Sequence, residues 1–187
     1  MSKFPGPTFE NLVRTYIHAK DENRPHLLAQ VFTPEAVLEM NVKTTTISFP
    51  QMSKGLAAIT DLLGREFCRT YENVYTFCLN RPGPAVVENH FSCDWIVGMS
   101  EKESGNVLVG CGRYDWFRSG KPGLIDHLQI RIKAMQVLPR DCLKPVLDWL
   151  VAIPYPWCTA NVITRTAPDI DALEPVMKYF NRNNVRV

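Results

Sequence analysis

Residues 107 to 133, VLVGCGRYDWFRSGKPGLIDHLQIRIK, contain two long runs of alternating polar and apolar side chains joined by a tight turn. The turn reads Ser-Gly-Lys-Pro-Gly, and glycine and proline in such a segment favour a reversal of the chain. Alternation with a period of two is the pattern of a strand that is buried on one face. The stretch therefore predicts a β-hairpin, and it contains most of the polar residues that are candidates for a site.

The overall composition is that of one soluble domain. The chain has 187 residues, of which 45% are hydrophobic, so it can bury a substantial core. Its formal net charge is +2 and its basic residues are interspersed with acidic ones, which argues against nucleic acid as a partner. No apolar run is long enough to span a membrane, and the N-terminus lacks the apolar core of a signal peptide. We therefore expect a cytoplasmic protein without a membrane partner.

The sequence lacks the short motifs that bind common metals and cofactors. Its six cysteines are far apart, with no CxxC pair and no cluster with histidine at metal-ligand spacing. Gly-rich phosphate loops, nucleophile elbows and HExxH signatures are also absent. We therefore expect no metal and no cofactor, and cysteines that act as small buried apolar side chains.

Hydrophobic spacing predicts helices before long strands. Apolar residues recur at helical intervals in three N-terminal segments, two short β-prone runs lie between the second and third helices, and two longer runs precede the hairpin. The expected helices span residues 9–20, 24–32 and 53–70, and the expected strands before the hairpin span residues 37–41, 44–49, 74–79 and 86–97.

Such segregation of helices and strands predicts the α+β class. We expect a cone-shaped fold, in which a curved antiparallel sheet wraps around three N-terminal helices and leaves an open end for a cavity. From Pro139 the pattern becomes helical again, with amphipathic segments that begin near Asp141 and Asp169. We expect a domain at residues 8–134 and a helical C-terminal extension at residues 139–187, packed on the domain or on a second subunit.

The alternation also assigns side chains to the two faces of each predicted strand. Phe91 and Trp95 belong to the more apolar face of their strand, and pairing apolar with apolar sets Val109 and Cys111 beside them. An apolar wall with a few convergent polar groups is what a small-molecule site requires. On this register the residues that share the cavity face with them are Asn89, Arg113, Asp115, Phe117, His127 and Gln129.

Asp115 beside His127 could form an acid–base unit, because the carboxylate would orient one ring nitrogen and leave the other to move a proton. The same residues could instead form a polar cluster that only holds the strands in register. The opposite face is too apolar to face water, so we expect the C-terminal helices or a homodimer partner to cover it. That face contains Tyr114, Trp116, Leu128, Ile130 and Ile132.

Several motifs together resemble the nuclear transport factor 2-like superfamily, in particular its SnoaL-like and ketosteroid-isomerase-like branches. They are Tyr16 in the first helix, LLAQVFTPEAVLEM at residues 27–40, KGLAAI at residues 54–59 and GRYDWFR at residues 112–118. The resemblance covers about residues 8–134. It implies a cone-shaped fold with a pocket for a small, largely apolar molecule between the sheet and the helices.

The resemblance also implies roles for single residues. In ketosteroid isomerases a first-helix tyrosine and a strand carboxylic acid hold the oxyanion, while a second carboxylate carries the proton. The tyrosine corresponds to Tyr16 and the oxyanion acid to Asp115, but the base corresponds to Met40, which cannot carry a proton. Scytalone dehydratases, lyases of the same fold, use a histidine pair around a water, for which His18 and His127 are the candidates here.

We expect a cofactor-independent lyase or isomerase that acts on a small hydrophobic ketone, enol or hydroxylated ring. Met40 favours an alternative, a non-catalytic protein that binds a small hydrophobic ligand. A structural or assembly domain with a filled pocket is the second alternative. The expected catalytic residues are Asp115, His127 and Tyr16, and the expected substrate-binding residues are Asn89, Arg113, Gln129, Met40, Phe91, Phe117 and His18.

Overall fold

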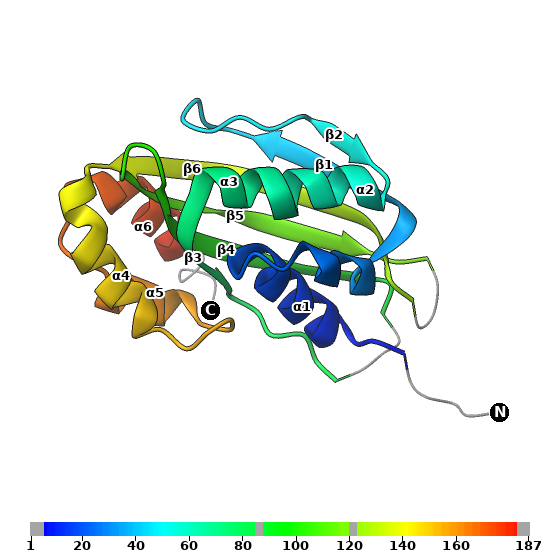
Figure 1. Cartoon of the computed structure of the whole chain (residues 1–187). Helices are drawn as coiled ribbons and strands as arrows, with labels where there is room; N and C mark the ends of the chain where they lie inside the picture. The colour runs from blue at the N-terminus through cyan, green and yellow to red at the C-terminus, as the bar shows by residue number, and fades with distance from the viewer. Residues whose placement is uncertain (1–5, 85–87, 120–122, 183–187) are drawn as a thin grey trace.

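A curved sheet forms the centre of the fold (Figure 1). The computed structural model describes residues 6–84, 88–119 and 123–182, and in these residues six strands follow the order β2-β1-β6-β5-β4-β3. Neighbouring strands are antiparallel, except that β1 and β6 are parallel. The strands are β1 (Phe32–Val42), β2 (Met52–Lys54), β3 (Tyr71–Cys78), β4 (His90–Glu101), β5 (Val107–Phe117) and β6 (Ile125–Leu138).

Helices from the first half of the chain cover one face of the sheet, as Figure 1 shows. Their buried side chains join those of the facing strands in the larger hydrophobic core. This arrangement confirms the α+β class and the sheet curved around N-terminal helices. The helices are α1 (Phe9–Asp21), the 3-10 helix η1 (Pro25–Gln30), and a continuous helix made of α2 (Leu56–Ile59), the π-helical η2 (Thr60–Glu66) and α3 (Phe67–Thr70).

Helix α1 forms where its sequence pattern predicts it. The Thr8 hydroxyl accepts a hydrogen bond from the Asn11 backbone N–H at 3.1 Å, which caps the first turn. Its apolar side chains follow a 3.6-residue period and lie on one stripe that faces the sheet. Tyr16 and Lys20 lie one turn apart on this buried side, so α1 directs both toward the inside of the cone.

Two predicted elements between α1 and α2 differ from the structure. The second predicted helix is only the 3-10 helix η1, and β1 begins already at Phe32. The segment 44–49 is irregular, and β1 pairs with β2 instead. Side chains explain part of this difference, because the hydroxyls of Thr44 and Thr46 bond to each other at 2.9 Å and Thr46 also donates to the Met135 carbonyl oxygen at 2.7 Å.

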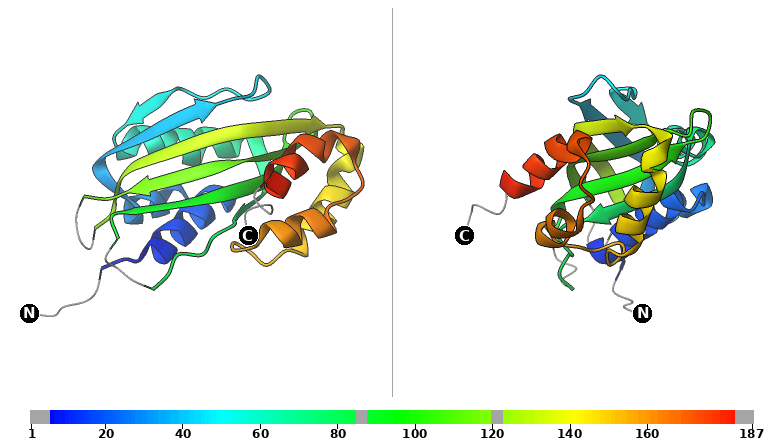
Figure 2. Two further views of the ribbon diagram at one scale, coloured as in Figure 1. Left: turned by 180° about the vertical axis from the view of Figure 1, so that it is seen from behind. Right: turned by 90° about the vertical axis from the view of Figure 1, so that its left-hand side faces the viewer.

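Three helices from the end of the chain cover part of the opposite, convex face of the sheet (Figure 2). They form a second hydrophobic cluster with Ile96, Val109 and Cys111 of the strands. The sequence predicted α4 and α6 but not α5, and the division into a domain and an extension stays a prediction. In the described residues no helix is long and apolar enough to cross a membrane. The helices are α4 (Leu143–Val151), α5 (Ala160–Thr166) and α6 (Glu174–Asn181).

Gly112 in β5 provides a test of this packing. A Cβ atom there would lie 1.8 Å from the carbonyl oxygen of Arg131 and 2.8 Å from the Trp95 ring, so Gly112→Ala forces strands apart. We expect a loss of about 1–3 kcal/mol or more in the free energy of unfolding, measured by urea denaturation. Gly83→Ala is the control, because nothing lies within 4 Å of its Cβ position. Equal stability of the two variants would contradict the described register of β5 and β6.

Candidate functional site

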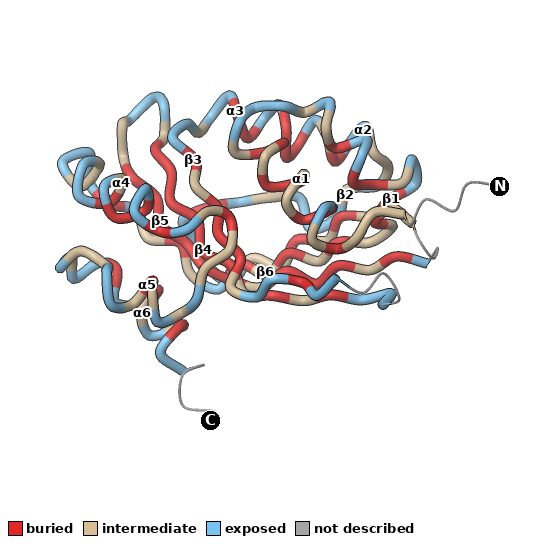
Figure 3. The backbone as a smooth tube through the Cα atoms, turned by 90° about the horizontal axis from the view of Figure 1, so that it is seen from below, coloured by how far each residue is buried: buried red, intermediate tan, exposed pale blue. Residues whose placement is uncertain are grey.

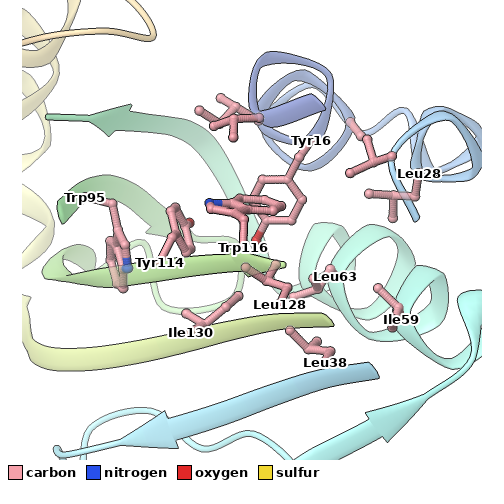
Figure 4. Close-up of a cluster of buried hydrophobic side chains, with 14 of the residues drawn as sticks. Tyr16, Leu28, Leu38, Ile59, Leu63, Trp95, Tyr114, Trp116, Leu128 and Ile130 are labelled. Carbon is pink, nitrogen blue, oxygen red and sulfur yellow. The ribbon is translucent and has the colours of Figure 1, made fainter. Parts of the chain in front are cut away.

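The β5–β6 hairpin divides its side chains between the inside of the cone and the convex face. The inward side chains, some of which are labelled in Figure 4, are Tyr114, Trp116, Leu128, Ile130 and Ile132, all at most 4% exposed. The side chains on the convex face include Arg113, Asp115, His127 and Gln129. The predicted assignment of the two hairpin faces was therefore wrong, and these four polar residues do not line the inside of the cone.

The physical reason for this error lies in β5. Val109 and Cys111 alternate in phase with Asp115, so the sequence predicts one buried face that contains them all. In the structure, Val109 and Cys111 pack beneath the C-terminal helices on the convex face. Cys93 of β4 pairs with Tyr114, and both belong to the core inside the cone. Figure 3 shows that the strands between the two groups of helices contain long buried stretches.

The same correction applies to the argument for a homodimer. The apolar face that was expected to need a partner is covered by helices of the same chain. Trp116 is fully buried, and its ring lies 5.0 Å from the ring of Tyr16 in α1. The exposed area that motivated a homodimer therefore does not exist on this face, and the homodimer stays a prediction.

A cavity of about 50 Å³ lies between the sheet and the N-terminal helices. Among the predicted site residues, Tyr16 and Met40 line it. The other lining side chains are mostly aromatic, aliphatic or methionine, and they include Phe67 and Met135. Pockets for small organic ligands commonly enclose about 300–1,000 Å³. The observed cavity is therefore a small, largely apolar space with few polar groups.

Five residues of the cavity lining have a hydrogen-bond donor in the side chain: Tyr16, Lys20, Thr76, Trp95 and Tyr114. The hydroxyls of Tyr16 and Tyr114 bond to each other, and burial raises the pKa of both, so both stay protonated. The indole Nε1 of Trp95 is buried and has no partner in the described residues. The Lys20 ammonium lies 4.6 Å from the centre of the Phe67 ring. Such a lining suits a ligand with an apolar body and an oxygen that accepts hydrogen bonds.

A buried ion pair holds Lys20 in place. Its Nζ lies 2.7 Å from Asp21 Oδ1 and 2.8 Å from Thr76 Oγ1. Asp21 also accepts from the backbone N–H of Thr76 at 2.7 Å, from the Thr76 hydroxyl at 2.9 Å and from the Tyr155 hydroxyl at 3.0 Å. The Lys20 and Asp21 side chains are 6% and 2% exposed. This network joins α1, β3 and the segment after α4 at one wall of the cavity.

The described residues that line the cavity include no carboxylate and no imidazole. Met40 occupies the position at which the resemblance places a base, and it lines the cavity as an apolar side chain. The carboxylate of Asp21 already accepts four hydrogen bonds from its surroundings. No group of three histidine, cysteine, aspartate or glutamate side chains suited to a metal occurs in the described ranges. The lining therefore supplies donors rather than acceptors.

Asp115 lies in an ionic cluster on the convex face. Its Oδ2 is 3.1 Å from Arg131 Nη1, and its Oδ1 is 3.3 Å from His90 Nε2 and 3.8 Å from Arg113 Nε. The Asp115 side chain is only 10% exposed because these groups surround it. The predicted pairing with His127 is thus replaced by contacts with His90 and two arginines.

His127 has a different carboxylate partner on the same face. Its Nε2 lies 3.4 Å from Glu39 Oε2, and Gln129 Nε2 donates to Glu39 Oε1 at 2.9 Å. The Phe117 ring stacks on His127 and also on His90, at centroid distances of 5.4 and 4.5 Å. These contacts fit the alternative in which the polar residues form a cluster that fixes the strand register.

Three further predicted site residues do not line the cavity. Asn89 is exposed, and its carbonyl oxygen accepts from the Arg118 backbone N–H at 3.0 Å. Phe91 is buried and packs against Phe9 at a centroid distance of 5.8 Å. The Nδ1 of His18 lies 2.5 Å from a carboxylate oxygen of Glu22, near the surface.

Sequence reasoning did not select several of the polar residues that do line the cavity. Lys20 follows Tyr16 by four residues, so the two side chains lie on one face of a helix. This spacing could have predicted Lys20 as a residue of the cavity lining. Trp95 was assigned to the correct face but only as an apolar residue. Tyr114 was assigned to the wrong face with the rest of its strand, and nothing in the sequence around Thr76 distinguishes it from an ordinary strand residue.

Comparison with solved structures identifies the fold. The chain is similar to a nuclear transport factor 2-like superfamily protein from Salmonella enterica serovar Typhimurium, with a TM-score of 0.51 and 20% sequence identity over 66% of this chain and 87% of that chain. It has the nuclear transport factor 2-like fold. No family model and no curated protein sequence matches the chain.

Two other structures with the nuclear transport factor 2-like fold bear the names of lyases. One is the hexachlorocyclohexane dehydrochlorinase LinA type 3 from Novosphingobium barchaimii, with a TM-score of 0.52 and 15% identity over 70% of this chain and 88% of that chain. The other is a protein from Novosphingobium aromaticivorans named as a scytalone dehydratase, with a TM-score of 0.51 and 13% identity over 71% of this chain and 90% of that chain. At these identities the similarity shows the fold alone.

Asp21→Asn tests the ion pair beside the cavity. It removes the negative charge from a buried ammonium, so we expect the free energy of unfolding in urea to fall by about 3–5 kcal/mol. Asp61→Asn is a matched control, because Asp61 pairs with Arg65 at the surface and such pairs contribute at most about 1 kcal/mol. If Asp21→Asn costs no more than the control, Lys20 is not held as a buried cation.

The cavity tyrosines predict how stability depends on pH. Burial raises the folded-state pKa of Tyr16 and Tyr114 above the value of about 10 in unfolded chains. Their contribution is therefore complete below about pH 10 and is lost as the pH rises toward the folded-state pKa. We expect the free energy of unfolding to fall above about pH 10, and to fall less steeply in Tyr16→Phe. Urea denaturation at several pH values would measure both slopes, and identical slopes would contradict this assignment.

Proposed function

We propose that the chain is a cofactor-independent lyase or isomerase that acts, inside the cone, on a small and largely apolar compound with a carbonyl or hydroxyl oxygen. The observation that supports this most directly is the presence of hydrogen-bond donors among the residues that line an otherwise apolar cavity: the hydroxyls of two tyrosines and a threonine, an indole N–H and an ammonium. A negative charge that develops on a substrate oxygen would be stabilised there, because fixed donors act strongly where water is excluded.

In this proposal the hydroxyls of Tyr16 and Tyr114 hold the substrate oxygen. Because their pKa values are raised, they stay donors at neutral pH and do not act as bases. Lys20, which lines the cavity and lies 2.7 Å from the Asp21 carboxylate, moves the proton: its ammonium donates a proton to the substrate oxygen, and the resulting amine takes up the proton lost from the neighbouring carbon. These roles replace those expected for Asp115 and His127, which lie on the convex face.

Met40 supports a second candidate, a protein that binds such a compound without converting it. The thioether at this position cannot accept a proton, and the described lining contains no carboxylate or imidazole that could do so instead. Binding requires only the apolar walls and the donors. The two candidates therefore share one site and one ligand class, and they differ only in whether the ligand is changed.

The small volume of the cavity limits the size of the ligand in both candidate functions. A compound larger than a few atoms must displace side chains, and methionine is the side chain best able to adapt, because it is unbranched and flexible. Met40, Met99 and Met135 all line the cavity. We expect a ligand to occupy space that these side chains fill in the structure.

Binding of 4-fluorophenol, a ring with one oxygen, tests the site. Fluorine NMR titration should show that Tyr16→Phe weakens binding about tenfold, since one hydrogen bond contributes about 1–1.5 kcal/mol. Tyr179→Phe is the matched control, because the Tyr179 hydroxyl donates to Asp94 on the convex face. Equal affinities in both variants would exclude the cavity as the binding site.

A second experiment separates conversion from binding. Small molecules that copurify with the protein are identified by mass spectrometry, and each is incubated with fresh protein while its NMR spectrum is recorded. A new product that requires Lys20, with the Lys20→Met and Asp21→Asn double variant as the inactive comparison, supports the lyase or isomerase. An unchanged ligand supports the binding protein.

A further inference from the structure

Phe49 is shared by the cavity and two hollows on the outside of the protein. It lines the inner cavity of about 50 Å³, an outer hollow of about 190 Å³ and a third hollow of about 340 Å³ beside β1. Phe67 lines both the inner cavity and the 190 Å³ hollow. Rotation of the Phe49 ring away from the core would therefore join the inner cavity to space outside it.

The segment that contains Phe49 makes few hydrogen bonds to the rest of the protein, and it is attached mainly by the apolar side chains of Ile47 and Phe49. Residues 44–50 connect β1 to β2 without regular structure, and the connection is anchored at its two ends by backbone hydrogen bonds from Lys43 to Ile132 and from Met40 to Gln51, both of 2.9 Å. In the described residues, the one hydrogen bond from residues 44–50 to the rest of the protein is that of Thr46 to the Met135 carbonyl oxygen. Rotation of the Phe49 ring breaks none of these bonds, so it costs only the contacts of one partly buried side chain.

We propose that Phe49 is the gate of the cone cavity and determines the size of ligand that it admits. With Phe49 displaced, the inner cavity, the 190 Å³ hollow and the space left by the Phe49 ring join, and their combined volume approaches the lower end of the range for organic ligands. The rings of Phe67 and Tyr71 lie 5.1 Å apart along this space, so it favours a planar apolar ring. The ligand's oxygen would then reach the donors at the inner end.

This inference rests on the proposed use of the cavity as a ligand site, but its test needs no ligand. Trp95 lines the inner cavity and is 3% exposed. In protein labelled with 5-fluorotryptophan, a small soluble nitroxide broadens the fluorine signal of an indole that it can approach. In the original chain we expect little broadening of the Trp95 signal, and in Phe49→Ala we expect several-fold more.

Two matched variants complete the experiment. Ile47→Ala shortens a side chain that lines only the inner cavity, and Tyr71→Ala shortens one that lines only the outer hollow. Both should leave the Trp95 broadening unchanged, because neither removes the partition between the two spaces. The fully buried Trp116 reports in each variant whether the core is intact. If Phe49→Ala disturbs the Trp116 signal as well, Phe49→Leu takes its place.

The outcomes are separate from those that test the proposed function. Broadening of Trp95 in the Phe49 variant alone supports the gate, whether or not any compound is converted. Broadening that is equal in Ile47→Ala, or absent in the Phe49 variant, overturns it, even if 4-fluorophenol binds at the tyrosines. If the Trp95 signal broadens in the Phe49 variant but 4-fluorophenol does not bind, the gate is supported and the proposed ligand class is wrong.

Discussion

Strand β5 is buried on both faces over its first half, and the position of the cavity depends on this constraint. On the convex side Val109 and Cys111 pack under the C-terminal helices. On the inner side the strand has Gly110 and Gly112, where a Cβ atom would lie 2.4 Å from Met135 and 2.8 Å from Trp95. The glycines leave room for these two neighbours, which line the cavity. Met135 and Trp95 thus fill the space over the glycines, and together with Tyr114 they line the cavity.

The Asp21 carboxylate illustrates how a buried charge can be retained. Removing an ion pair from water costs several kcal/mol per charge, and only good geometry with further hydrogen bonds offsets that cost. Asp21 meets this condition with donors from its own helix, from β3 and from Tyr155. An apolar pair would fill the same space without that cost. The ion pair instead places a cation beside an apolar cavity, in an orientation set by three parts of the chain.

The sequence alone predicts the fold class, most of the helices and strands, and two residues of the cavity lining. It does not predict the other polar residues of the lining. Tyr16 and Met40 could be predicted because a single stripe or a motif places each of them. The polar half of the hairpin could not, since a period of two shows which residues share a face but not which face is inside when both are apolar. Val109 and Cys111 gave the misleading signal, because the helices that cover them come from residues far along the chain. Lys20 could have been predicted as well, because it follows Tyr16 by one helical turn.

The apolar part of the convex face, which the C-terminal helices cover, would become exposed if the chain were shortened. Ile96, Val109 and Cys111 are fully buried only because the C-terminal helices lie on them. A version that ended after β6 would present this apolar surface to water, and surfaces of that kind drive non-specific association. It would also lack the Tyr155 hydroxyl that donates to Asp21. The last quarter of the chain thus covers an apolar part of the sheet and supplies a hydrogen bond to the wall of the cavity.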